Sequence, residues 1–316
     1  RSAKKAYEAA KFEEKAVYIS LLSDTASVYT NILEYDELIA KQKEIVKILE
    51  DIKTADLKKY KRGVINSFEL NNSEQNLINA KNKLLNLKKE QSVLLMQLAV
   101  LAGISPDCAE NLKRGNLASF EYTSKIPEEV QSDVIFARPD VMEAETKLEK
   151  AKIDIRVARK EFLPSFNITG IWAFNTIAPG TFFSWQSSLA AIIAGAAQDI
   201  FTGGRKLANL RMQKAKYEEL FEAYRQTDLE AVKEVNTSLC FIKHDTNIEN
   251  NTKSKLNYER ENFADTQKKF ARGIISYPDY LAGRSKLASS EIEAAQAKTQ
   301  RIVNYFTLYK AVGGQL

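Results

Sequence analysis

The placement of proline is the strongest constraint on how this chain of 316 residues can fold. No proline occurs before Pro106 and none occurs between Pro179 and Pro278, while Gly63 is the only glycine before Gly103. Because proline costs about 3 kcal/mol inside a helix, each of these proline-free stretches can form continuous helix. The chain is therefore predicted to fold mainly into very long helices.

Residues 1–103 have the pattern of a long antiparallel helical hairpin. Apolar residues recur at helical spacing over residues 2–60, which predicts one helix about 80 Å long at about 1.5 Å per residue. A second helix is predicted between Ser67, whose residue type is typical of an N-cap, and Gly103, which suits a helix C-terminus. Its seam follows the heptad spacing of supercoiled helices. The seam has two rows, Leu70, Leu77, Leu84, Gln91 and Leu98, and Ala80, Leu87, Leu94 and Leu101.

The second half of the chain repeats the first half at an offset of 210 positions. Residues 268–276 match residues 58–66, and Asp279 then falls on Glu69. A repeat of this length predicts two copies of one supersecondary unit. Residues 205–316 are therefore predicted to form a second long helical hairpin.

Three segments separate the two helical hairpins. Residues 104–137 contain scattered proline and glycine, which predicts an irregular connection. Residues 138–163 return to helical spacing and are predicted to form a helix that leads into residues 164–204. In that last segment apolar residues occupy every second position, which predicts a β-hairpin. The first strand alternates Phe166, Ile168, Trp172 and Phe174 with Asn167 and Thr169, and the return strand alternates Phe183, Trp185, Leu189, Ala191 and Ile193 with Ser184, Gln186 and Ser188.

The alternation in the β-hairpin leaves two interpretations open. An apolar face opposite a polar face is what the wall of a membrane β-barrel requires, and aromatic residues near the turn are typical of a membrane interface. This aromatic girdle consists of Trp172, Phe174, Phe182, Phe183 and Trp185. The other interpretation is a soluble coiled-coil scaffold or tethering protein whose hairpin packs on the helices. Because two strands cannot close a barrel, membrane insertion would require strands from other chains.

Composition and the scarcity of reactive residues argue against several classes of function. The formal net charge of +5 is modest and aromatic residues are not interleaved with a basic patch, so nucleic acid is not an expected partner. Cys108 and Cys240 are far apart in the sequence, and His244 lies in a polar helical stretch typical of solvated surface. The sequence has no motif for a nucleophile with its base, a metal cluster or a phosphate loop. We therefore expect neither an enzyme nor a cofactor or metal site.

Several motifs resemble those of the TolC-like outer-membrane efflux proteins. The most specific is the run that starts with Arg138-Pro139-Asp140 and continues to Gly170. The other similar segments are Phe201–Arg205, the two sequences around Gly63 and Gly273, and the terminal Leu308–Gly314. The resemblance implies a fold that is mainly α with a β-hairpin. Long antiparallel coiled-coil hairpins would form an α-barrel, and the strands would contribute to a trimeric transmembrane β-barrel.

The resemblance also implies a function and a set of partners. The expected function is an outer-membrane exit duct of a tripartite efflux or type I secretion system, conducting small molecules or polypeptide from a periplasmic pump complex to the exterior. The expected partners are two further copies of the chain in a homotrimer, a periplasmic adaptor protein, outer-membrane lipid and, indirectly, an inner-membrane pump. The expected location is the outer membrane of a Gram-negative bacterium, with the helices in the periplasm. Because protomers of that family supply two β-hairpins and this sequence contains one, we expect the chain to be incomplete at its N-terminus.

Finally, the resemblance assigns roles to the turns of the helical hairpins. The residues that would dock the adaptor are Arg62, Gly63, Val64, Arg272, Gly273 and Ile274. Glu69 and Asp279 would lie just inside the periplasmic aperture, where three copies of Asp279 would form an acidic ring that favours cations. A carboxylate at a helix start also serves as a cap, so that interpretation stays open. Phe270 and Ile275 stand where family members often carry a tyrosine–arginine latch, so that latch is not expected here.

Overall fold

The computed structural model describes residues 1–111, 113–117, 130–174, 180, 185, 188–199 and 201–315. The chain divides into two compact units. The first unit combines Arg1–Glu13 with Pro139–Leu229, and the second combines Glu14–Arg138 with Glu230–Leu316. Among the described residues, no helix has a stretch long and apolar enough to cross a membrane.

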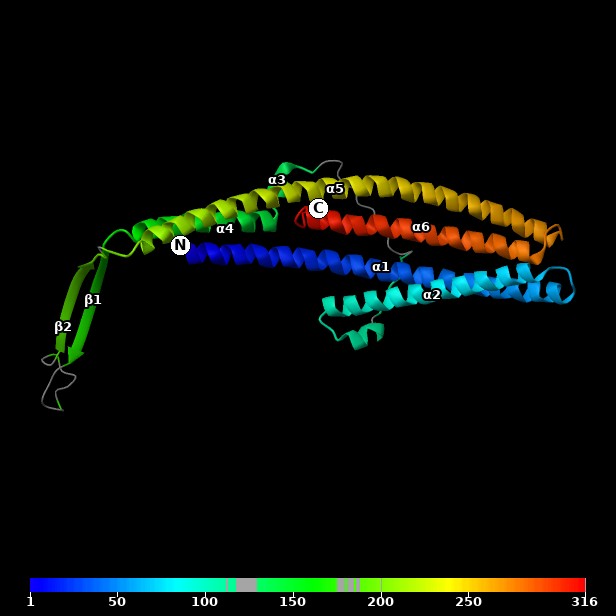
Figure 1. Ribbon diagram of the computed structural model, residues 1–316, viewed down its shortest axis with the longest axis horizontal. Helices are drawn as coiled ribbons and strands as arrows, with labels where there is room; N and C mark the ends of the chain where they lie inside the picture. Colours follow the sequence, from blue (N-terminus) through cyan, green and yellow to red (C-terminus); the bar gives the residue numbers. More distant parts are fainter. Residues whose placement is uncertain are drawn as a thin grey trace. The chain divides into compact units, whose positions relative to one another are not determined.

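Four long helices dominate the chain, as the distribution of proline predicts (Figure 1). They are α1 (Ser2–Lys61), α2 (Ser67–Leu101), α5 (Arg205–Ala271) and α6 (Tyr277–Ala311). The N-cap of α2 is Asn66 and not the predicted Ser67, because the Asn66 backbone is extended and its side chain accepts a hydrogen bond from the Glu69 backbone amide. Ser67 is already the first helical residue.

The predicted heptad seam of α2 is confirmed by its burial. All nine residues of its two rows are buried or half-buried, and Leu77, Ala80 and Leu98 are fully buried. A core cluster of the second unit joins α1, α2 and α6 through the side chains of Leu38, Ile45, Ala80, Ala288 and Ile292, among others. Burying one apolar side chain contributes about 1.5–3 kcal/mol, so this shared seam holds the two helical hairpins together.

The apolar stripe of α1 is buried over only part of its length. In the second unit Val17 and Leu21 are 61% and 41% exposed, whereas Val28 and Ile32 are buried. The reason is the unequal length of the hairpin arms, since α1 has 60 residues and α2 has 35. Because α2 runs back along α1 from the turn for only 35 residues, it covers α1 only as far as the region of Val28.

A polar cluster lies between α5 and α6 inside the second helical hairpin. The Glu249 side chain is only 5% exposed and forms ion pairs with Arg301 and, at 2.7 Å from its Oε1 to Nζ, with Lys253. Burial raises the pKa of Glu249, but the hydrogen bond from Lys253 and the charge of Arg301 outweigh burial, so the pKa is lowered. The ionised pair therefore remains intact at neutral pH.

Arg138 connects the short helix α3 (Ser132–Phe136) to two long helices of the second unit. Its side chain is 7% exposed, and Nη1 donates to the Ala311 carbonyl at 2.7 Å while Nη2 donates to Glu234 Oε2 at 2.8 Å. A guanidinium at the end of α6 satisfies a terminal carbonyl and complements the helix dipole. The next helix, α4 (Pro139–Lys160), begins directly after Arg138. The connection before α3 also contains a 3₁₀ helix, η1 (Pro106–Asn111).

The β-hairpin consists of β1 (Ser165–Phe174) and β2 (Ser188–Ala197), paired antiparallel in the first unit. Ser165 pairs with Ala197, and Phe174 pairs with Ser188. All ten residues of β1 are exposed, including Ile168 at 77%. The apolar face of β1 is thus not packed on helices of the first unit. A soluble scaffold would require such packing.

The aromatic girdle is only partly within the described residues. Trp172 lies in β1 and packs edge-to-face against Trp185, with 6.3 Å between ring centroids, and Phe174 ends the strand. Phe182 and Phe183 lie outside the described residues. Trp185 was predicted as a strand residue, but it lies before β2, which begins at Ser188. Ser188 Oγ donates a hydrogen bond to the Trp185 carbonyl at 2.7 Å.

Candidate functional site: the turns of the helical hairpins

The two helical hairpins turn through the same backbone geometry. Gly63 has a φ of 72° and its amide donates to the Tyr60 carbonyl at 2.9 Å, while the Val64 amide donates to the Lys59 carbonyl at 3.0 Å. This pair of bonds is a Schellman motif, which requires a left-handed residue after the helix. The second turn repeats it with Gly273, whose φ is 69°. Glycine occupies the left-handed position in each turn because it has no Cβ to strain.

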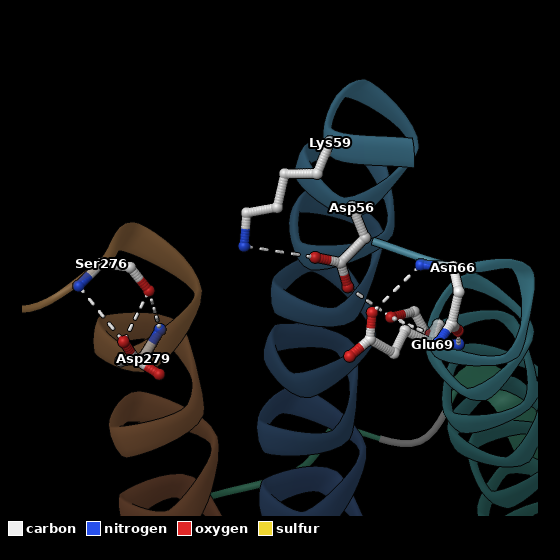
Figure 2. A network of polar contacts seen from close by, with 7 residues as sticks. Asp56, Lys59, Asn66, Glu69, Ser276 and Asp279 are labelled. Atoms are coloured by element: carbon white, nitrogen blue, oxygen red, sulfur yellow. Dashed lines mark hydrogen bonds and ion pairs between the residues drawn. The ribbon is translucent and has the colours of Figure 1, made fainter. Parts of the chain in front are cut away.

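A capping box starts the returning helix in each hairpin (Figure 2). In the first turn Asn66 caps the Glu69 amide at 3.0 Å, and Glu69 Oε2 accepts from the Asn66 amide at 3.2 Å. In the second turn Ser276 and Asp279 make the equivalent reciprocal bonds at 3.3 and 3.2 Å. Glu69 and Asp279 therefore both act as helix caps, one of the two roles left open by the sequence.

Capping uses only one oxygen of each carboxylate. The bonds to Asp279 go to Oδ2, and the bond to Glu69 goes to Oε2. Over the described part of the chain, Asp279 Oδ1 and Glu69 Oε1 accept no hydrogen bond from another residue. Each acid thus caps its helix and retains one oxygen that can face solvent or an ion.

Lys59 brings the two turns into electrostatic contact. Figure 2 shows its side chain extended from α1, and its Nζ lies 3.7 Å from Asp56 Oδ1. Hydrogen bonds from Ser276 lower the pKa of Asp279, and the charge of Lys59 lowers it further. Because the folded-state pKa is lowered, the stabilisation by this cap is present above the ordinary aspartate pKa and is lost as pH falls through the lowered value.

The residues expected to dock an adaptor are exposed at the turns. Val64 and Ile274 are 68% and 65% exposed, and both Arg62 and Arg272 are exposed beside them. Each turn therefore presents one apolar side chain next to one guanidinium. Isolated apolar side chains are common on protein surfaces, but here the same combination occurs at both turns.

An aromatic cluster beside the second turn was not foreseen from the sequence. Phe270 stacks on Tyr280 with 4.9 Å between centroids and lies 5.8 Å from Tyr277, and Tyr280 also contacts Phe263 at 5.5 Å. Two spacings in the sequence could have indicated it. Phe263 and Phe270 are seven residues apart on one helix, and Tyr277 and Tyr280 are three residues apart on the next. Phe270, which cannot provide a latch hydroxyl, instead holds the ends of α5 and α6 together.

The cluster continues into an ion pair between the two helical hairpins. The Arg284 guanidinium lies 5.6 Å from the centroid of Phe263. Its Nε is 2.5 Å from Glu44 Oε1 on α1. This contact joins α6 to α1 a few helical turns from the hairpin ends.

Replacing Gly63 with alanine is expected to destabilise the first turn by about 1 kcal/mol, because a Cβ is disfavoured in the left-handed conformation. Nothing lies within 4 Å of the position of that Cβ, so the cost comes from backbone strain and not from a clash. Hydrogen exchange of the turn amides in the full-length gene product should accelerate about fivefold. Gly63→Asn is the matched control, because asparagine tolerates this conformation and should accelerate exchange less. Equal exchange in both variants and the wild type would contradict this account of the turn.

Among the described residues, no group of three or more His, Cys, Asp and Glu side chains could hold a metal ion. The two cysteines are exposed and free.

The sequence is similar to that of a known protein family and of several known proteins. Residues 1–104 and 131–314 match the family described as "Outer membrane efflux protein". The outer membrane protein OprJ of Pseudomonas aeruginosa is 26% identical over 72% of this chain and 47% of its own length. The cation efflux system protein CusC of Escherichia coli K12 is 26% identical over 60% of this chain and 42% of its own length. The chain thus spans about half the length of these curated relatives.

Solved structures match the fold over nearly the whole chain. The Campylobacter jejuni CmeC outer membrane channel superimposes with a TM-score of 0.85 at 22% identity, covering 99% of this chain and 66% of that one. The open state of the Neisseria gonorrhoeae MtrE outer membrane channel has a TM-score of 0.81 at 22% identity, with 99% and 70% coverage. At this level of identity the likeness establishes a shared fold.

Proposed function

The chain belongs to the outer membrane efflux protein family, and on this premise we propose that it forms part of an exit duct across the outer membrane of a Gram-negative bacterium. The duct would carry small molecules or polypeptide delivered by a periplasmic pump complex. The observation that carries this proposal is the β1 strand, whose ten residues are all exposed and which has an alternating apolar face, in the same chain as two repeated helical hairpins. The work of such a protein is conduction and gating.

The β-hairpin is suited to a membrane wall in length and pattern. Each strand has ten residues, and a tilted strand needs about 9–11 residues to cross the hydrocarbon core. Phe166 and Ile168 face one side of β1, and Asn167 and Thr169 face the other. The register pairs Thr169 with Ile193, so Ile193 of β2 lies on the side of Thr169 and not, as its alternation predicted, on the apolar side of β1. Because a two-stranded sheet leaves both edges unpaired, we propose that three copies of the protein contribute strands to one closed barrel.

The helical hairpins are proposed to form the periplasmic part of the duct, with their turns facing the adaptor. The support is the paired exposure of Val64 with Arg62 and of Ile274 with Arg272. An apolar side chain next to a guanidinium is suited to a protein partner, since arginine and apolar anchors are typical of interface centres. We propose that the inner-membrane pump is engaged through this adaptor.

Asp279 is proposed to contribute to an acidic ring at the periplasmic aperture. Its Oδ1 is not used in capping, and its lowered pKa keeps the carboxylate charged at neutral pH. In a trimer, three such charges would attract cations by the same electrostatics as the acidic rings of cation channels. Glu69 would occupy the equivalent position in the first hairpin.

Replacing Asp279 with asparagine should weaken block of the channel by multivalent cations. The amide is isosteric and retains an oxygen for the cap, while three negative charges are removed from the ring. The concentration of hexaamminecobalt(III) needed for half block in planar bilayers should rise several-fold. Asp265→Asn removes an exposed carboxylate from α5 near the same turn and should leave block unchanged. Identical block of the wild-type and Asp279→Asn channels would contradict the proposed acidic ring.

Fractionation of the full-length gene product tests the proposed location and assembly. We expect the protein in the outer-membrane fraction, released only by detergent, and trapped as a trimer by cross-linking. A monodisperse monomer that is soluble without detergent would contradict the proposal and favour the scaffold interpretation.

A further inference from the structure

A cavity of about 630 Å³ lies at the foot of the β-hairpin, within the first unit. Its lining includes Ser165 and Ala197, the paired end residues of β1 and β2. The remaining lining comes from the end of α4, the start of α5 and the residues that join them to the strands. The cavity therefore lies where the β-hairpin joins α4 and α5. Figure 1 shows the ribbons of β1 and β2 running into these two helices.

The charges of the cavity are not balanced. The Lys206 Nζ lies 3.4 Å from Asp199 Oδ2, so these two charges compensate each other. Glu161 Oε2 accepts a hydrogen bond from the neutral Asn209 amide at 3.0 Å. Two further cations, Lys160 and Arg205, line the same cavity, so the lining carries three cations and two carboxylates. Within the described parts of the chain, their side chains have neither an ion-pair nor a hydrogen-bond partner.

We propose that this cavity binds the phosphate headgroup of an anionic membrane lipid in the periplasmic leaflet. The arginine fork matches phosphate oxygens in a bidentate manner, and lysine adds a point charge. The inference rests on the proposed function, since it requires the β-hairpin to lie in the membrane with its helix end at the periplasmic surface. It adds a defined lipid site at the boundary of the hydrocarbon core.

The neighbouring apolar side chains distinguish a lipid from free phosphate. Leu163 lines the cavity and is 64% exposed. Phe201, which precedes α5, is 90% exposed, and Phe166 at the start of β1 is 78% exposed. A soluble phosphate ion would gain nothing from these surfaces, whereas the acyl chains of a lipid would remove them from water. The combination of free cations with exposed apolar side chains is that of a membrane-interface anchor.

Native mass spectrometry of the full-length gene product in neutral detergent tests the site. The protein is supplied in parallel with phosphatidylglycerol, phosphatidylcholine or inorganic phosphate at equal concentration. The test variant is Lys160→Gln/Arg205→Gln. The control is Arg211→Gln/Lys214→Gln, which removes two exposed cations from α5 outside the cavity. At about fivefold per cation near an anionic surface, the test variant should bind phosphatidylglycerol about thirtyfold more weakly, and the control should bind as the wild type does.

Three results would overturn the proposal. Equal loss of phosphatidylglycerol in both variants would show a general charge effect. If the wild type retained phosphatidylcholine as well as phosphatidylglycerol, the site would not be selective for an anionic lipid. Retention of inorganic phosphate as strong as that of phosphatidylglycerol would assign the cavity to free phosphate. Outer-membrane fractionation of the full-length gene product distinguishes failure of the lipid site from failure of the exit duct. A wild-type protein found there without selective lipid retention refutes the lipid site alone, whereas its absence from that fraction refutes the exit duct.

Discussion

Replacing Ile168 with lysine is expected to prevent the full-length gene product from assembling in the outer membrane. Ile168 is 77% exposed near the middle of β1, on the apolar face of the strand. A lysine on the lipid face near the bilayer midplane costs about 2–4 kcal/mol, and a homotrimer carries the substitution three times. The trimer recovered by cross-linking from the outer-membrane fraction should fall to a small part of the wild-type amount.

Thr169→Lys is the matched control for this prediction. Thr169 is the next residue of β1, is also exposed and faces the opposite side of the sheet. If that side lines a water-filled lumen, a lysine there is solvated and assembly should approach the wild-type level. Equal assembly of both variants, or failure of Thr169→Lys alone, would contradict the assignment of the apolar face to lipid.

Replacing Glu249 with alanine is expected to destabilise the second helical hairpin by about 3 kcal/mol. The substitution removes a carboxylate that is 5% exposed and pairs with both Arg301 and Lys253. Removing one member of a buried ion pair typically costs about 3–5 kcal/mol. The expected result is a clear fall in the urea concentration at which the helical signal of the full-length protein is half lost.

Glu293→Ala is the control, because Glu293 pairs with Lys255 between the same two helices but both side chains are about half exposed. An exposed pair contributes about 0–1 kcal/mol, so the urea midpoint should change little. Since the pKa of Glu249 is lowered, its contribution is present above the ordinary glutamate pKa and is lost as pH falls through the lowered value. The gap between Glu249→Ala and the wild type should therefore narrow at acid pH. A gap as small as that of Glu293→Ala at neutral pH would contradict the buried-pair account.

The long helices and the β-hairpin were predictable because their signals are local. Proline and heptad spacing determine α2 and α6 without reference to distant residues, and alternation determines β1. The errors were also local. Ser67 and Asn66 are both good N-cap residues, so spacing alone could not choose between them. Trp185 continued the alternation of β2 in the sequence, but the strand begins only at Ser188.

The parts of the site that the sequence did not reveal depend on contacts between distant segments. Lys59 acts on Asp279, although the two are separated by most of the chain. Glu249 on α5 pairs with Arg301 of the returning helix, 52 residues further along the chain. Lys160 and Arg205 line the same cavity because the paired strands β1 and β2 return the chain from the end of α4 to the start of α5. Composition and periodicity carry no signal for these juxtapositions, since each residue type is ordinary on a solvated helix.

The ion conductance of the purified full-length gene product in a planar lipid bilayer shows whether this chain forms an exit duct. We expect discrete conductance steps that favour cations, since Asp279 would lie at the aperture. The Ile168→Lys protein should give such steps far less often than Thr169→Lys. Folded trimers that enter the bilayer but give no conductance steps would contradict the central claim that this chain forms a channel.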